Sequence, residues 1–141
     1  PAMTDPSDLI RRLEAATIGN RELDALVWVA ILPRDGKGFD GFDCPEGRHY
    51  EYDAEEDGKV NLYVVLGNKT SMRRAKRPAP HYTTSIDAAL PSENIVSCMW
   101  NSENWSALHD FGDDRPLVEG IGKTEALARR IAALKAREPH P

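Results

Sequence analysis

The chain has little cysteine and no long hydrophobic run. Its two cysteines, Cys44 and Cys98, are far apart and belong to no C-x-x-C pair, so they form no recognisable metal or redox motif. One disulfide would be compatible with them, but two free thiols in a reducing compartment is the preferred interpretation. The longest apolar run, 25–33, is far shorter than the roughly 20 residues of a membrane-spanning helix. No membrane partner is expected.

Positive charge is also scarce. The 18 lysines and arginines face 23 acidic residues, which gives a formal net charge of −5. An acidic chain does not attract the phosphate backbone of a nucleic acid, so nucleic-acid binding is not the expected role. One segment, 67–80, is locally basic and is an exception.

What is present is typical of a small globular domain. A chain of 141 residues with 40% hydrophobic residues can form one core, and a domain of this size buries about two-thirds of its unfolded surface. We expect a single domain over 4–138. Residues 1–3 are interpreted as a cloning scar before a native start at Met3, and no signal peptide is recognised after it. A cytosolic protein is predicted.

Two helices are predicted near the N-terminus. Asp5-Pro6 suits an N-cap followed by a first helical residue, and apolar residues at helical spacing extend this helix over 6–17. A second helix is predicted over 21–32 and is ended by Pro33. The β-branched run 27–31 would also fit a buried strand.

The middle of the chain predicts a hairpin between two irregular segments. Residues 33–48 are rich in glycine and proline and are expected to form a loop. Strands are predicted over 49–53 and 59–66, because an Asp-Gly turn joins two β-rich segments. The basic segment 67–80 is expected to be an exposed, mobile connector.

The second half begins with a short helix predicted over 85–90, with Thr83 or Thr84 as its cap. Two strands follow over 94–100 and 104–109. Apolar residues occur at both alternating sets of positions in the first of these strands, so both of its faces are expected to be partly covered.

A final helix is predicted over 125–137, capped by Thr124. Taken together, the elements predict an α+β fold, in which helix, antiparallel sheet and helix form the layers of a single-domain sandwich. No internal repeat is found.

Several segments resemble one known family. They are LIRRLEAA (9–16), RELDA (21–25), YTTSIDAAL (82–90), WSA (105–107), EALA (125–128) and AALKAR (132–137). Together they resemble the phage ABA sandwich domain, a family of small bacteriophage proteins of unknown function. The resemblance implies a phage origin, an α/β/α layering and a location in the cytoplasm of the bacterial host. It leaves out most of 33–79, which is interpreted as an inserted loop and hairpin.

Two glycine-containing motifs are compatible with phosphate binding but have simpler explanations. The stretch 36–41 matches G-x-G-x-x-G, yet Pro45 and Gly47 prevent the helix that must follow, so a flexible loop is preferred. Residues 122–124, Gly-Lys-Thr, resemble the end of a P-loop, but Leu117 stands where that motif requires glycine. Helix capping explains them better.

Metal and catalytic signatures are incomplete. Asp53, Glu55 and Asp57 resemble the start of a calcium loop, but the twelfth position is Val64, so a hairpin turn is preferred. No cofactor is predicted. The histidines form no H-x-x-x-H pair, and no G-x-S-x-G elbow occurs. Acid–base sets would have to assemble in space; the candidates are His109 with Asp110, and His81 with Ser85 and Asp87. An enzyme is not expected.

The candidate binding residues are basic or aromatic. Arg73, Arg74, Lys76 and Arg77 could hold a phosphate group, and Tyr82 is the nearest ring that could stack on a base, although a solvated basic loop is the simpler interpretation. Tryptophan is enriched at interface hot spots, so Trp100 and Trp105 are further candidates. They, like Trp28, are more often core residues.

These observations favour a binding function. The leading hypothesis is a non-enzymatic phage accessory protein that binds a host protein, a component of bacterial defence. The alternative is a module that sequesters a small phosphorylated or nucleotide signal in a pocket lined by Arg73, Arg74 and an aromatic ring. A small enzyme and a virion-associated protein are weaker alternatives. A homodimer could form through an edge strand beside the 49–66 hairpin.

Overall fold

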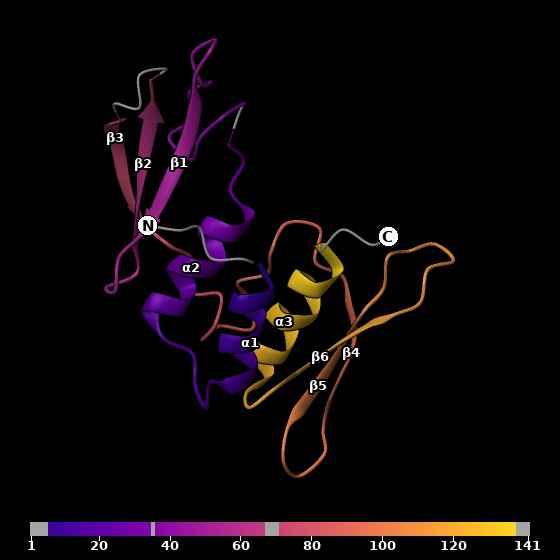
Figure 1. The fold of residues 1–141 in the computed structure, drawn as a ribbon. Coiled ribbons are helices and arrows are strands. Elements are labelled where there is room, and N and C mark those ends of the chain that lie inside the picture. Colours follow the sequence, from indigo (N-terminus) through magenta and orange to yellow (C-terminus); the bar gives the residue numbers. More distant parts are fainter. Residues whose placement is uncertain (1–5, 35, 67–70, 138–141) are drawn as a thin grey trace.

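The computed structural model describes residues 6–34, 36–66 and 71–137. This part of the chain holds three helices and two three-stranded antiparallel sheets. In Figure 1 the helices lie between the two sheets, with β1, β2 and β3 at one end of the molecule and β4, β5 and β6 beside α3. The predicted α+β class and the antiparallel pairing are confirmed.

The two N-terminal helices are α1 (Pro6–Ala15) and α2 (Arg21–Ile31). Helix α1 ends two residues earlier than predicted, and its predicted cap, Asp5, lies outside the described residues. Residues 27–31 belong to helix α2 and do not form the alternative strand. It is capped by Asn20, whose side-chain oxygen accepts a hydrogen bond from the Leu23 amide at 2.8 Å.

The first sheet contains the predicted hairpin, β1 (His49–Ala54) and β2 (Lys59–Val65). Its third strand, β3 (Ser71–Pro78), corrects the prediction of an irregular connector over 67–80; positions 67–70 lie outside the described residues. Strand β3 forms backbone hydrogen bonds to β2 and leaves nearly all its side chains exposed. An edge strand of this kind needs no apolar alternation, so the sequence pattern did not indicate it.

The second sheet contains β4 (Ile95–Trp100), β5 (Trp105–His109) and β6 (Val118–Gly122). Strand β6 was not predicted, because Gly120 and Gly122 weaken a strand signal. A Cβ at Gly120 would lie 2.3 Å from the backbone nitrogen of Ala132 in α3 (Glu125–Arg137). The glycine is therefore required for the close approach of this helix to the sheet.

The predicted cap of α3 is confirmed. The Leu127 amide donates a hydrogen bond to the hydroxyl oxygen of Thr124 at 3.1 Å. This contact accounts for the Gly-Lys-Thr sequence without a phosphate group.

Residues 85–90 form turns, which corrects the prediction of a short helix. The buried side chain of Arg130, on α3, takes the place of helical hydrogen bonds: it donates to the carbonyl oxygens of Tyr82, Ser85 and Ile86. The same guanidinium pairs with the buried carboxylate of Glu93. Burial lowers the pKa of Arg130, and Glu93 opposes this effect.

The predicted caps of that helix have other roles. Thr83 is buried, and its hydroxyl lies 2.6 Å from Oδ1 of Asp24, which also accepts the Thr83 amide at 2.7 Å. Asp24 is itself fully buried and pairs with Arg21 at 2.7 Å. This network joins α2 to the segment that follows β3.

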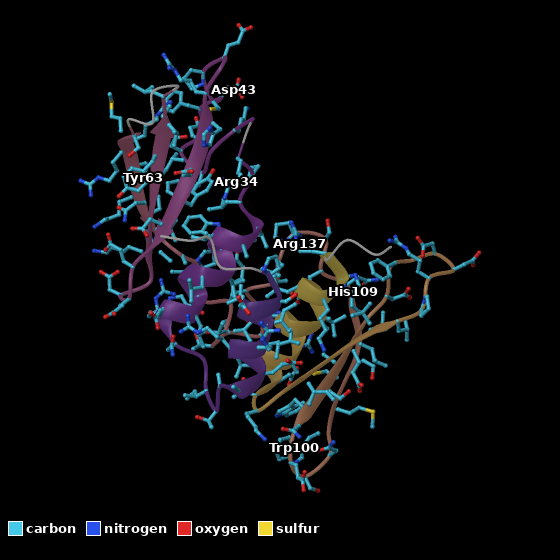
Figure 2. All side chains as sticks on the ribbon, in the orientation of Figure 1. Arg34, Asp43, Tyr63, Trp100, His109 and Arg137 are labelled. Carbon is cyan, nitrogen blue, oxygen red and sulfur yellow. The ribbon has the colours of Figure 1, made fainter. Side chains whose placement is uncertain are left out.

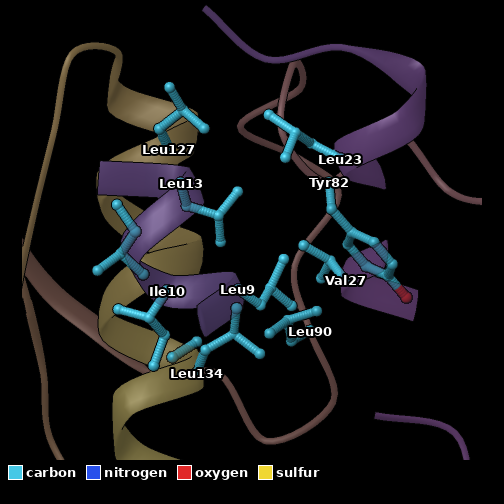
Figure 3. Packing of buried hydrophobic residues seen from close by; sticks show 11 residues of the cluster. Leu9, Ile10, Leu13, Leu23, Val27, Tyr82, Leu90, Leu127 and Leu134 are labelled. Carbon is cyan, nitrogen blue, oxygen red and sulfur yellow. The ribbon is translucent and has the colours of Figure 1, made fainter. Parts of the chain in front are cut away.

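The main core lies between the three helices and the 82–90 segment (Figure 3). Its buried apolar residues are Leu9, Ile10, Leu13, Leu23, Val27, Tyr82, Leu90, Leu127, Ile131, Ala133 and Leu134. A separate cluster of Tyr50, Leu62 and Val64 packs against Phe39 and Cys44, so the loop before β1 covers one face of the first sheet. No described helix is long and apolar enough to cross a membrane.

Candidate functional site

The four predicted basic residues lie on the edge strand β3, and two of them have acidic partners. Nε of Arg74 lies 3.4 Å from Asp40, and its guanidinium lies over the ring of Phe42 at 5.4 Å. Nζ of Lys76 lies 2.8 Å from Glu55, and this bond lowers the pKa of Glu55. The remaining two, Arg73 and Arg77, are exposed and pair with no carboxylate among the described residues. The positive charge of this strand is thus half neutralised.

Tyr82 lies in the main core and not beside these cations. Its side chain is 4% exposed, and burial raises the pKa of its hydroxyl. The ring is therefore covered by apolar neighbours and presents no free face to a base. The prediction that it stacks on a ligand is wrong, because the backbone after β3 turns inward at Ala79.

The three tryptophans have different environments. Trp28 packs in the core, with its ring stacked on Phe39 at 4.8 Å. Trp100 and Trp105 face each other across β4 and β5 with ring centroids 5.8 Å apart. Trp105 is half-buried, whereas Trp100 is 52% exposed. Only Trp100 therefore offers a large exposed aromatic surface at the end of the second sheet.

The glycine-rich stretch and the acidic turn are structural. Gly36 and Gly41 have φ angles of 73° and 84°. An isolated antiparallel β-bridge pairs Lys37 with Asp43 and closes the loop that they bound. No helix follows it, as expected from the sequence. In the described part of the chain, no three histidine, cysteine, aspartate or glutamate side chains are grouped so as to hold a metal ion.

The histidines are dispersed, and His140 lies outside the described residues. His49 lies 3.5 Å from Glu51 on β1. Nδ1 of His81 lies 3.9 Å from the buried carboxylate of Asp24. His109 is 5% exposed and lies at the end of β5.

The second sheet has one face that α3 does not cover. Ala107 is fully buried against α3, so Ser106 and Leu108, its neighbours in β5, point to the opposite side. Their partners on β4 and β6 complete this surface, which we call the open face: Ser97, Met99, Ser106, Leu108, Glu119 and Ile121. Helix α3 covers the opposite face, while Ser97, Ser106 and Leu108 on the open face are half-buried, so the prediction that both faces are partly covered is confirmed.

Large apolar side chains are exposed on and around the open face. Met99 is 66% exposed and Ile121 is 42% exposed, and both lie opposite Ser106 in neighbouring strands. Val96, at the irregular start of β4, is 53% exposed. Trp100, at the other end of β4, pairs with Trp105 and therefore lies on the opposite face, the one towards α3. The sequence contains the alternation that places them on a strand, but it does not say which face is left uncovered.

A cavity of about 300 Å³ lies at the other end of the second sheet. It is lined by the 91–94 segment, His109 to Phe111, Arg115 and the last turn of α3. Figure 2 shows His109 and Arg137 near each other at the C-terminal end of α3. Of these residues, sequence reasoning singled out only His109 with Asp110; the arginines come from segments that have no local motif.

The wall of the cavity is held by defined contacts. Nδ1 of His109 accepts a hydrogen bond from the Asn94 amide at 3.2 Å, and its ring meets Phe111 edge-on at 5.1 Å. Arg115 stacks over Phe111 at 3.9 Å and pairs with Asp113. This pairing lowers the pKa of Asp113 and raises the pKa of Arg115.

No protein-family model, curated protein or solved structure matches this chain. The resemblance to the phage ABA sandwich family therefore stays a prediction, and the functional argument depends on the surfaces described above.

Proposed function

We propose that this protein acts by binding another protein through the open face of the second sheet. The observation that carries the proposal is the exposure of Met99 and Ile121, which lie on either side of Ser106 in one row across the three strands of the open face. A small domain that leaves apolar side chains together on a flat sheet face has a surface suited to a protein partner. No bound cofactor is needed for such a role.

The charge of the chain favours one kind of partner. The open face carries Glu119, whose carboxylate accepts a hydrogen bond from Ser106 at 2.5 Å, and the chain as a whole has a formal net charge of −5. A partner with an apolar patch bordered by lysine or arginine would complement both features.

We further propose that this partner is a protein of the bacterial host, a component of a defence system that the phage-encoded chain inhibits. The support is the resemblance of the helical and 82–90 segments to small phage proteins, together with the absence of an intact catalytic signature in the sequence. Occlusion of a host protein requires only a complementary surface.

The alternative of a nucleotide-sequestering module has less support than the open face. Arg74 is engaged by Asp40 and Phe42, and Tyr82 is buried. Of the two predicted cations only Arg73 is unpaired among the described residues, and the exposed ring beside Arg74 is Phe42 and not Tyr82.

The test is site-specific photo-crosslinking in host lysate. A photoreactive phenylalanine at position 99 should give a discrete covalent product with a host protein, whereas the same group at Tyr63, on the first sheet, should not. The identified protein is then purified, and its affinity is measured by calorimetry for the wild type and for Met99→Ser/Ile121→Ser.

We expect at least a tenfold loss of affinity in the double variant, because two apolar side chains leave the interface. Arg73→Gln is the control and should bind as the wild type does. Equal affinities of the wild type and the double variant would contradict the proposal. A covalent homodimer as the only crosslinked product would instead assign the open face to a second copy of this chain.

A further inference from the structure

The geometry points to a binding site for a small organic anion, a carboxylate or a phosphate monoester, in the cavity lined by His109, Arg115 and Arg137. This inference is independent of the proposed protein partner, because the cavity and the open face are different surfaces. The volume of about 300 Å³ lies at the lower end of the range of small-molecule sites.

Arg137 is the principal cation of the cavity. One of its terminal nitrogens donates to the carbonyl oxygen of Pro91 at 2.9 Å, which fixes the guanidinium at the rim. Within the described part of the chain it pairs with no carboxylate. A guanidinium that is positioned by a backbone contact and retains its charge is well suited to bind a carboxylate or phosphate oxygen.

Arg115 and His109 supply further donors. Arg115 uses Nε and one terminal nitrogen for Asp113, which leaves donors on its other terminal nitrogen. Nδ1 of His109 accepts the Asn94 amide, so a neutral ring carries its proton on Nε2. That Nε2–H group has no partner among the described residues and is available to an acceptor.

Of the acidic groups around the cavity, Glu93 and Asp113 are paired with arginines, and Asp110 pairs with no cation among the described residues. Glu93 pairs with the buried Arg130 and accepts the Leu90 amide at 3.1 Å. Asp110 accepts the Gly112 amide at 2.8 Å, and Asp113 is held by Arg115. The C-terminal end of α3 is the negative end of the helix dipole, so the anion would be held by the arginine side chains and not by the helix.

Apart from Ser92 and Asn94, the remaining lining is apolar. Pro91, Ala133 and Ala136 form part of the wall, and Phe111 lies beneath Arg115. Cations beside an apolar wall select an organic anion over an inorganic one, because the compact apolar part of the ligand is also removed from water.

The experiment is an NMR titration of the whole chain with phenyl phosphate and with benzoate, following the ring signals of His109. Benzyl alcohol, a neutral compound of similar size, is the ligand control. We expect saturable shifts at His109 with at least one of the two anions and none with benzyl alcohol. Both anions failing to shift His109, or benzyl alcohol shifting it equally, would overturn the inference.

Charge-matched variants locate the site. Arg137→Gln should weaken anion binding at least tenfold, since it removes charged hydrogen bonds, and Arg115→Gln should weaken it less. Arg73→Gln removes the same charge from β3 and should leave the affinity unchanged. A loss of affinity in Arg73→Gln with none in Arg137→Gln would overturn the inference and move the site to β3. Melting curves of each variant show whether it is folded.

Discussion

The two sheets have the same strand topology but differ in the side chains that they bury and expose. Each is an antiparallel arrangement of three strands in sequence order. The first sheet buries large side chains, Tyr50, Leu62 and Val64, and exposes a basic edge on β3. The second buries small ones, Gly120 and Ala107, and exposes apolar side chains on its open face. One strand order therefore supports two different kinds of surface.

The difference follows from what covers each sheet. The loop before β1 and the end of α2 cover the first sheet. Because a loop can adapt its course, large side chains fit in this contact, among them Phe39 from the loop and Tyr52 from the sheet. The rigid helix α3 covers the second sheet and approaches it closely, so the contact is made by Ala128, Ala132 and the glycines of β6. Small residues are required where a helix backbone meets a strand backbone.

The largest expected effect comes from a substitution that disrupts the contact between β6 and α3. Gly120→Val should destabilise the protein by about 4 kcal/mol or more, because the added Cβ would meet backbone atoms of Ala132 and Ala128 that have no room to move. Urea unfolding followed by tryptophan fluorescence measures this. Glu119→Val places the same side chain one position earlier, on the open face, and should change stability by less than about 0.5 kcal/mol. Similar losses in both variants would show that the close contact is not the cause.

A smaller effect is expected in the first sheet. Leu62→Ala should cost about 3 kcal/mol, because it removes a fully buried side chain from a cluster that a loop can partly refill. Hydrogen exchange should show faster exchange in β1 and β2, with β5 and β6 changed less. A uniform increase across both sheets would mean that the two sheets open as one unit. Lys59→Ala, an exposed change on β2, is the control.

The smallest effect is the pH dependence that Tyr50 and Tyr52 of the first sheet contribute. Burial raises the pKa of Tyr52 to about 12, and it also raises the pKa of Tyr50. The folded state thus retains a proton that the unfolded state loses near pH 10, so this stabilisation is complete below pH 10 and is lost as the pH rises towards 12.

We expect Tyr52 to account for about 1 to 2 kcal/mol of that loss, after allowance for its partial exposure. Unfolding free energies at several alkaline pH values measure it. Tyr52→Phe should flatten the decline. An unchanged slope in this variant would rule out Tyr52 as the source.

Local patterns in the sequence determined much of the fold. The Asp-Gly turn predicted the β1–β2 hairpin, and helical spacing together with Thr124 predicted α3. These signals are local, because turn geometry, capping and periodicity depend on residues that are close in the chain. The same reasoning correctly explained the Gly-Lys-Thr sequence as a helix cap.

Contacts between distant segments determined the rest. Strand β3 depends on pairing with β2, and the turns of 85–90 depend on Arg130, whose side chain replaces the hydrogen bonds of the predicted helix. The burial of Tyr82 and the exposure of Met99 were decided in the same way. A sequence pattern states which residues can share a face, but only tertiary packing decides which face is covered, because that depends on where distant segments come to rest.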